Sequence, residues 1–404
     1  MLEAYNPGQL VQDSIALGQP IVFVSINYRV SAYGGLLGAQ AIEVGATNTG
    51  ILDQRLALQW VKKHIYDFGG DPDKVTIYGQ SAGGGSVVGQ LVIEGQKPEG
   101  LFSGAFVSSG AFGWHYGRDA YLGYQNTLYN LTNCVDSSDP VECMRSVPEA
   151  DMWTAVNSIG SDMFGSNFGP TFGDDAIPLD PKDLIRQGKV ANVPLMVGTT
   201  TDEFTGFVTY PLNTSANGAN YLGSSFLTLT PKLGSTLWPL YANFSDSEIL
   251  PSIANASFVP TYPPAFLRTA AASNDILFHA NREFLLNAFV NQSRPVYGYS
   301  FGQQTDAIAS SATQAKFGVT HSGDTPWWFG STISATRGGQ QLGTDMRRAL
   351  ISFVHTGNPS TKDLEWEDYA QSKSSIMSFK SNSTGMTSNT NRRAQLDAAL
   401  GFLG

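Results

Sequence analysis

The chain has 404 residues, of which 42% are hydrophobic and 11% aromatic, so it has enough apolar surface for a large core and is not globally disordered. Its formal net charge is −10 and only 14% of its residues are charged, which argues against nucleic acid or an anionic membrane surface as the main partner, because both need a basic footprint. No apolar run approaches the length of a membrane-spanning helix.

Strands and helices are predicted to alternate along the chain. The apolar run Pro20–Arg29 predicts a strand buried on both faces, and the apolar stripe within 51–65 predicts a helix. Val75–Tyr78 predicts a short strand, with a helix following from Ser86. Further strands are predicted at 104–109, 193–198 and 296–301, and amphipathic helices at 274–290 and 345–354. This alternation predicts an α/β fold with a doubly wound, mainly parallel sheet.

The chain offers no clean linker, so residues 1–404 are expected to form one domain. Residues 205–265 are rich in Ser, Asn, Thr and Pro and predict an irregular excursion, which with the helix after it extends over 205–290.

Two cysteines, Cys134 and Cys143, lie nine positions apart in a polar stretch. Without a nearby histidine they make a poor zinc site, so no metal is predicted there. The spacing permits a small-loop disulfide, and the alternative is two unrelated thiols.

The chain has features of a secreted protein. Six N-x-S/T sequons lie at Asn130, Asn213, Asn243, Asn255, Asn291 and Asn382, which mildly favour secretion and glycosylation. The first residues lack a basic and then apolar leader, so no signal peptide is predicted in this chain. Features of a secreted protein without a signal peptide suggest that residue 1 of this sequence is not the amino terminus of the full-length protein.

Gly79-Gln-Ser-Ala-Gly83 has the pattern of a nucleophile turn between a predicted strand and a predicted helix. Such a turn exposes the serine hydroxyl, and its neighbours must be small because strand and helix approach closely. Ser81 is therefore the candidate nucleophile. The alternative is an ordinary glycine-rich turn.

A serine hydroxyl needs a base, and His321 is the candidate. It lies in a loop after the last strong strand, Gly318-Val-Thr-His-Ser-Gly-Asp324, while His64, His115, His279 and His355 are better explained as core or surface residues. The third member is a carboxylate between serine and histidine. Asp202 and Glu203 follow the strand at 193–198, Asp174 and Asp175 compete with them, and spacing alone does not choose.

Several segments together resemble the type-B carboxylesterase/lipase family, which includes secreted fungal lipases and the cholinesterases. The run Phe68-Gly-Gly-Asp-Pro-Asp-Lys-Val-Thr-Ile-Tyr-Gly-Gln-Ser-Ala-Gly83 resembles the serine-site signature of that family, and Asn27-Tyr-Arg29, 52–60 and Ser108-Ser-Gly110 resemble further landmarks. The resemblance implies an α/β-hydrolase fold. It selects Glu203 as the acid, assigns the backbone N–H of Ala82 to the oxyanion, and makes Cys134/Cys143 similar to a disulfide loop of the family.

This sequence departs from the family pattern in three ways. Phe204 stands where a glycine usually follows the acid, and Gln80 replaces the usual glutamate before the serine. The family's oxyanion loop and lid segment have no counterpart here, nor does the strand that would lie between 20–29 and 75–78. The chain is therefore expected to be an amino-terminally truncated form that lacks the first strands of the fold, with a gap in its sheet and with activity impaired by the loss of the oxyanion loop.

The predicted function is hydrolysis of a small-molecule or lipid carboxylic ester through an acyl-enzyme, with no cofactor or metal, no nucleic-acid partner and no stable membrane insertion. The aromatic run Trp327, Trp328 and Phe329 is predicted to line an apolar substrate pocket, with core packing as the alternative. A non-catalytic relative that serves in binding or adhesion is the rival from another class, and thioester, amide or peptide hydrolysis is a second enzymatic alternative.

Overall fold

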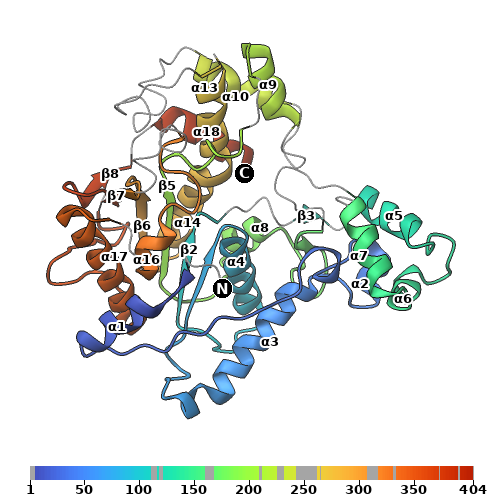
Figure 1. The fold of residues 1–404 in the computed structure, drawn as a ribbon, viewed down its shortest axis with the longest axis horizontal. Helices are drawn as coiled ribbons and strands as arrows, with labels where there is room; N and C mark the ends of the chain where they lie inside the picture. The colour runs from blue at the N-terminus through green and yellow to red at the C-terminus, as the bar shows by residue number, and fades with distance from the viewer. Residues whose placement is uncertain are drawn as a thin grey trace.

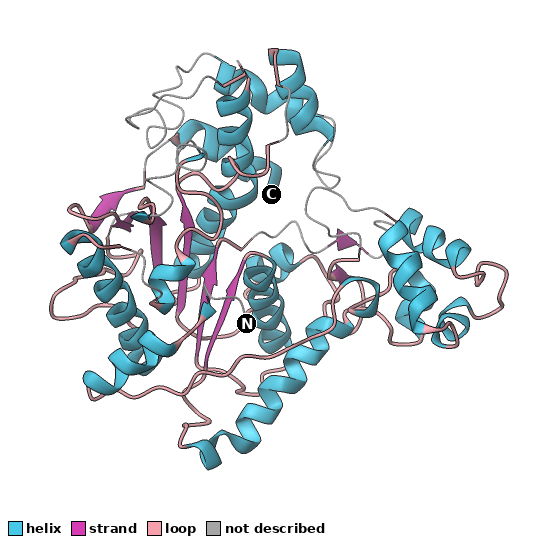
Figure 2. Cartoon of the chain, viewed as in Figure 1, coloured by secondary structure: helices cyan, strands magenta, loops and turns pink. Residues whose placement is uncertain are grey.

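The computed structural model describes residues 5–110, 116–117, 122–159, 168–208, 212–224, 232–242, 262–263, 265–306, 317–330, 334–372, 374–389 and 392–403. Its centre is a six-stranded sheet with helices on both faces, as Figures 1 and 2 show. The strand order is β1-β2-β5-β6-β7-β8, and all neighbours are parallel except β7 and β8. These strands are β1 (Thr76–Gln80), β2 (Gly104–Ser108), β5 (Leu195–Thr200), β6 (Val296–Phe301), β7 (Ser375–Phe379) and β8 (Gly385–Ser388).

The helices lie before, between and after these strands, and a small parallel pair, β3 (Tyr116–Gly117) with β4 (Thr171–Phe172), stands apart from the main sheet. The α-helices are α1 (Gly8–Ala16), α2 (Gly38–Glu43), α3 (Thr49–His64), α4 (Ala82–Gln96), α5 (Leu122–Leu131), α6 (Pro140–Arg145), α7 (Glu149–Ser158), α8 (Pro181–Arg186), α9 (Ser215–Ser224), α10 (Lys232–Ala242), α13 (Phe266–Asn274), α14 (Ala280–Asn291), α16 (Thr325–Phe329), α17 (Arg337–Thr356) and α18 (Arg393–Leu403). The described residues also form two 3₁₀ turns, η2 (Ser31–Tyr33) and η3 (Ile65–Phe68), and the π-helical turn η5 (Asp275–His279).

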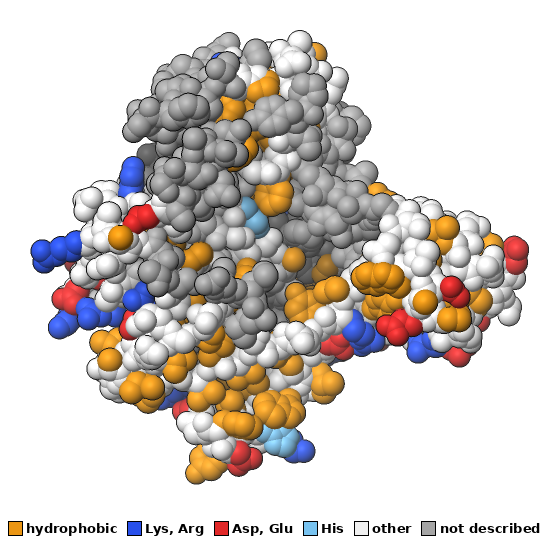
Figure 3. Space-filling model, in the orientation of Figure 1, with side chains coloured by type: hydrophobic (Ala, Val, Ile, Leu, Met, Phe, Trp, Pro, Cys, Tyr) orange, Lys and Arg blue, Asp and Glu red, His pale blue; other side chains and the backbone are white. Residues whose placement is uncertain are grey.

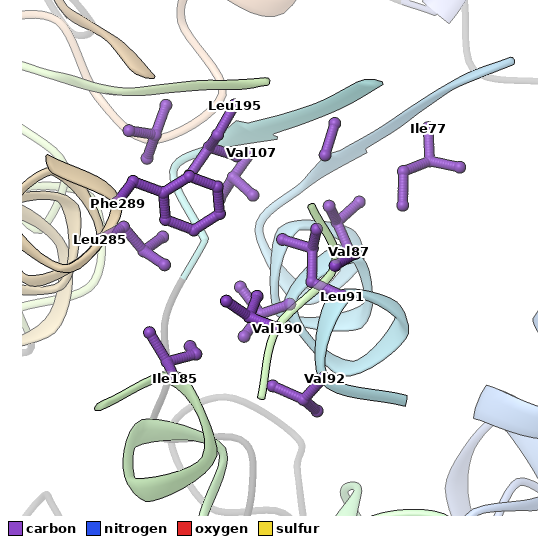
Figure 4. Close-up of a cluster of buried hydrophobic side chains, with 14 of the residues drawn as sticks. Ile77, Val87, Leu91, Val92, Val107, Ile185, Val190, Leu195, Leu285 and Phe289 are labelled. Carbon is purple, nitrogen blue, oxygen red and sulfur yellow. The ribbon is translucent and has the colours of Figure 1, made fainter. Parts of the chain in front are cut away.

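The two faces of the sheet carry two separate apolar clusters, because successive residues of a strand point to opposite sides. Along β2, Ala105 and Val107 pack against α4, α8 and α14, and Figure 4 shows the Val107 side of this cluster. Phe106 points the other way and packs with residues of α1, α16 and α17. The strands are therefore buried on both faces, which explains their nearly continuous apolar sequences.

Helices α9, α10, α13 and α18 form a further apolar cluster beyond the carboxyl end of β5. The described part of the predicted excursion over 205–290 is thus largely helical, and the helix predicted at 274–290 is divided into η5 and α14 by a π-helical turn.

The predicted disulfide is present. Cys134 and Cys143 are bonded, with 5.7 Å between their Cα atoms. The bond joins the segment after α5 to α6, in the lobe of α2, α5, α6 and α7 at the right of Figure 1. Both cysteines belong to the lobe's own apolar cluster, so the cross-link stabilises the packing of this lobe.

The strand predicted at Pro20–Arg29 is wrong. The segment is extended, but within the part of the chain that the structure describes it pairs with no strand. Val22 and Val24 are 45% and 42% exposed, while Phe23 packs against the core. An apolar run shows that a segment is suited to a sheet, but a strand forms only where a neighbour is present to receive its hydrogen bonds. Among the described strands, β1 has β2 as its one neighbour.

Apolar side chains also gather on the outer face of α3 and the turn that follows it, in the lower part of Figure 3. Leu56, Trp60, Tyr66 and Phe68 are 65%, 47%, 78% and 63% exposed. An exposed group of this kind is uncommon on a soluble surface and marks a face suited to covering by another segment or molecule.

A buried ion pair fastens the carboxyl-terminal helix to η5. Arg392, which precedes α18, donates two 2.7 Å hydrogen bonds to the carboxylate of Asp275. Asp275 is fully buried and also accepts a bond from the Tyr241 hydroxyl. Burial alone would raise the pKa of Asp275, but Arg392 and His279 outweigh it and hold that pKa far below its ordinary value.

Replacing Arg392 by methionine is therefore expected to lower the free energy of unfolding by about 3–5 kcal/mol, because it leaves a buried carboxylate without its main counter-charge. Urea unfolding followed by circular dichroism measures the change. The matched control is Arg348→Met. Arg348 forms a 3.2 Å ion pair with Asp363 at the surface, and its loss is expected to lower the free energy of unfolding by less than about 1 kcal/mol. Equal losses in the two variants would contradict the importance of the buried pair.

Candidate active site

Ser81 occupies the turn between β1 and α4, as the motif predicted. Its φ of 59° and ψ of −121° lie in a region that a non-glycine residue rarely adopts. A side chain at Gly79 would collide with the carbonyl oxygen of Gly83, so the strand and helix approach as closely as glycine allows. The half-buried Ser81 is thus held in a strained conformation at the carboxyl end of β1.

The predicted oxyanion donor, Ala82, is the first residue of α4 and is exposed. The N–H groups in the first turn of a helix have no partner within the helix, and the helix dipole places partial positive charge there. The backbone N–H of Ala82 therefore belongs to a set of donors suited to a negative oxygen beside Ser81.

His321 lies in the loop between β6 and α16, and its ring is held at both nitrogens. Nδ1 is 2.6 Å from Oε2 of Glu203, and Nε2 is 3.1 Å from Nε2 of Gln80. Gln80 is the last residue of β1 and directly precedes Ser81. Among the hydrogen bonds of the described residues, none joins the Ser81 hydroxyl to this ring, so the imidazole lies against the neighbour of the nucleophile.

The Glu203 carboxylate has a partner for each of its oxygens. Oε1 accepts hydrogen bonds from the Ser109 hydroxyl at 2.6 Å and from the Thr200 N–H at 2.7 Å, and Oε2 faces His321. Burial alone would raise the pKa of Glu203, but His321 and these hydrogen bonds outweigh it and keep the pKa below its ordinary value. An ionised carboxylate only accepts, so Nδ1 of His321 is the donor in this contact. In the neutral ring the lone pair is then on Nε2.

The three other candidates for the carboxylate of the triad, Asp202, Asp174 and Asp175, do not bond His321 among the described contacts. The Asp202 carboxylate accepts the N–H of Val319, at the start of the His321 loop. Asp174 accepts hydrogen bonds from the side chains of Thr47 and Asn48, which ties two distant loops together, and Asp175 is exposed. Of these four candidates, Glu203 is the one that contacts His321.

The remaining histidines lie elsewhere or outside the described residues. The ring of His64 packs on Trp60 in α3, and His355 bonds the carbonyl oxygen of Gln19. His279 lies between Asp275 and the carbonyl oxygen of Thr200. His115 lies outside the residues that the structure describes.

Most of α16 consists of Trp327, Trp328 and Phe329, and none of these residues is more than 1% exposed. Trp328 packs on Phe106 and bonds the Asp324 carboxylate, and all three residues belong to the core cluster on one face of the sheet. Their contacts are those of core aromatics, and nothing in them supports the predicted pocket role.

The structure adds site residues that the sequence analysis did not assign. Ser109 follows β2 directly, and its position at the carboxyl end of a central strand was the available signal. The side chain of Asn274 accepts the N–H of Phe204, and His279 bonds the carbonyl oxygen of Thr200. Asn274 is the last residue of α13, directly before the π-helical turn η5, and His279 is the last residue of that turn. Both ends of the turn therefore bond the segment that carries Glu203.

The side chains that surround the imidazole are mostly apolar. The rings of Phe207 and Phe278 lie 5.4 Å and 4.9 Å from the ring of His321, centroid to centroid. Phe204, which replaces a glycine of the family pattern, points away into the helical cluster and is fully buried.

Comparison with known proteins places the whole chain in one group. A model of the carboxylesterase family matches residues 2–397. Lipase 4 of Diutina rugosa is 32% identical over 92% of this chain and 67% of its own length. Secreted lipase 1 of Botryotinia fuckeliana is 33% identical over 74% of this chain and 54% of its own. An inactive carboxylesterase-like protein of Byssochlamys spectabilis is 29% identical over 81% and 58%. The matches thus span about one half to two thirds of the length of these relatives.

Two solved esterase structures resemble this chain in fold. EstA of Aspergillus niger superposes with a TM-score of 0.83 and 27% identity, over 99% of this chain and 77% of that one. A PNB esterase, at 23% identity and a TM-score of 0.75 over 97% and 76%, shares the fold.

Proposed function

Because the chain belongs to the carboxylesterase family, we propose that it hydrolyses carboxylic esters through Ser81, His321 and Glu203. The resemblance to that family and the α/β-hydrolase fold that it implied are confirmed by the family match and by the superposition on EstA. The observation that carries the proposal is the 2.6 Å contact of Glu203 with His321, whose other nitrogen lies against the neighbour of Ser81.

The proposed reaction begins when Oγ of Ser81 attacks the ester carbonyl carbon and its proton passes to Nε2 of His321. Glu203 holds the ring by Nδ1–H and stabilises the imidazolium that forms. The Ala82 N–H and the dipole of α4 stabilise the tetrahedral oxyanion. The C–O bond to the alcohol then breaks, and His321 returns the proton to the departing oxygen.

Water completes the cycle. His321 takes one proton from the water, the hydroxide oxygen attacks the acyl carbon, and the bond to Ser81 breaks to give the carboxylic acid and a reprotonated serine. The rings of Phe207 and Phe278 beside the imidazole favour an ester with an apolar acyl or alcohol part, so small-molecule and lipid esters are the proposed substrates.

A fluorophosphonate probe tests this proposal. Attack by an activated serine forms a Ser–phosphorus bond and releases fluoride, and we expect the label on Ser81 by peptide mass spectrometry. Labelling that disappears in Ser81→Ala supports the hydrolase. Absence of label on folded wild-type protein would instead favour a non-catalytic binding protein, the second candidate, to which the inactive relative of Byssochlamys spectabilis lends support.

We further propose that the protein is secreted and N-glycosylated. Two relatives are named as secreted, and the asparagines of the sequons within the described residues, Asn130, Asn213, Asn291 and Asn382, are exposed. None of the described helices has the length and hydropathy to cross a bilayer. Protein from a eukaryotic secretory host is expected to lose mass on treatment with peptide-N-glycosidase, and an unchanged mass would contradict the glycosylation.

A further inference from the structure

Gln80 connects the proposed base, His321, to Tyr5, a residue that precedes α1. Its Nε2 lies 3.1 Å from Nε2 of His321, and its Oε1 accepts a 3.0 Å hydrogen bond from the Tyr5 hydroxyl. The contact with His321 spans 241 positions of sequence and the contact with Tyr5 spans 75, so two distant segments converge on this one side chain.

The proton positions along this chain of contacts follow from the groups themselves. Glu203 is an acceptor, so Nδ1 of His321 is the donor, and the neutral ring, which is the form that acts as a base, has its lone pair on Nε2. A lone pair requires a donor opposite it, which places the NH₂ of Gln80 toward His321 and its carbonyl oxygen toward Tyr5. Tyr5 is half-buried, and that burial raises the pKa of its hydroxyl, which therefore stays a donor. The opposite amide orientation would set a carbonyl oxygen against the imidazole lone pair.

We propose that Gln80 is a positioning residue for the proposed hydrolase: oriented by Tyr5, its amide donates into the Nε2 lone pair of His321 and stabilises the neutral imidazole. That lone pair is the one that accepts the serine proton, so the amide keeps the base in its competent form and holds its ring beside Ser81. The amide is also a competitor, because it occupies Nε2 until the Ser81 hydroxyl displaces it. This inference rests on the proposed function.

The charged and titratable groups near the imidazole are few among the described residues. Its other faces meet the aromatic rings of Phe207 and Phe278. The groups that titrate on the elements packed around it are Glu203 and Asp202 on the loop after β5, Asp275 with its partner Arg392 and His279 on η5, Asp324 in its own loop, Tyr78 on β1, and Tyr5, which bonds Gln80. Of these, Glu203 alone contacts the ring, so a change at Gln80 acts on Nε2 without altering the Nδ1 partner.

The order of three pH profiles tests the proposal. In kcat/KM for p-nitrophenyl butyrate, the midpoint of the acidic limb reports formation of the imidazolium in the free enzyme. Gln80→Met keeps the length of the side chain but removes the donor, so the midpoint is expected to rise by about half to one pH unit. Gln80→Glu places an anion against Nε2 and is expected to raise it by at least about one unit above wild type. The expected order is therefore wild type, then methionine, then glutamate.

Tyr5→Phe is the matched probe of the amide orientation. It is expected to move the midpoint upward by less than Gln80→Met does, and to add nothing when it is combined with Gln80→Met. A downward shift in Gln80→Met would mean that the carbonyl oxygen faces the ring, and it would overturn the proposal. Unchanged midpoints with altered kcat would reduce Gln80 to a purely structural role and would overturn it equally.

A second measurement separates this inference from the proposed function. The imidazole ring of His321 can be titrated by NMR in the Ser81→Ala protein, with its signals assigned by their loss in His321→Gln. The same order of midpoints is expected there without any turnover. Fluorophosphonate labelling of Ser81 without this order of midpoints would support the hydrolase and reject the role of Gln80. The expected order of midpoints without labelling would support the contact of Gln80 with His321 and reject the hydrolase.

Discussion

Replacement of Ser81 by alanine is expected to lower kcat for p-nitrophenyl ester hydrolysis on the order of 10⁶-fold, the loss seen when a serine nucleophile is removed from a catalytic triad. The loss is this large because His321 and Glu203 act only on the serine proton and contribute little once the hydroxyl is gone. KM is expected to change far less, since the removed oxygen bonds the substrate only as the reaction proceeds.

The folded state provides the control. Alanine has no steric conflict that serine lacks at φ 59°, so Ser81→Ala should unfold at the wild-type temperature. Ser86 lies in α4, the helix that follows Ser81, and its hydroxyl accepts a hydrogen bond from Gln54. Ser86→Ala removes that hydroxyl and is expected to keep activity within a few-fold of wild type. Retention of a tenth or more of wild-type kcat by Ser81→Ala would require a different nucleophile.

The strand–turn–helix around Ser81 could be predicted from sequence because its determinants are local. Small residues at Gly79 and Gly83, an apolar strand before them and an apolar helix after them leave one compact arrangement. The strands β2, β5 and β6 were predicted for the same reason, since each is a short run that is apolar on both faces.

Features that depend on contacts between distant segments could not be predicted in this way. Asp202 and Glu203 are adjacent, and only the direction of each side chain separates a loop contact at Val319 from a contact with His321. Ser109 meets Glu203 across 94 positions, and Gln80 meets His321 across 241. No local pattern encodes such pairings.

The same limit explains two predictions that the structure does not support. The composition of Pro20–Arg29 suits a strand, but composition does not tell whether another strand lies beside it, and β1 pairs with β2 alone among the described strands. Three aromatic residues after His321 suit a pocket as well as a core, and the direction of α16 turns all three toward the sheet.

Replacement of Glu203 by glutamine is expected to lower kcat about 10⁴-fold, because it gives His321 the wrong tautomer. The Ser109 hydroxyl and the Thr200 N–H both donate to Oε1, so the carbonyl oxygen of a glutamine is held at that position. Its NH₂ then occupies the position of Oε2 and points at Nδ1 of His321. Nδ1 must become the acceptor, and the ring proton moves to Nε2, where it removes the lone pair that would take the serine proton.

Steady-state kinetics on Glu203→Gln, with Asp202→Asn beside it, decide which acid serves His321. Asp202→Asn removes a carboxylate that bonds the Val319 N–H, so its effect is expected mainly on unfolding temperature, with kcat of the folded protein within about tenfold of wild type. A near-normal kcat in Glu203→Gln together with a collapse in Asp202→Asn would assign the acid to Asp202. With the expected result, the hydrogen bonds that hold Oε1 are as necessary as the charge on Glu203, since they determine which of its atoms faces the imidazole.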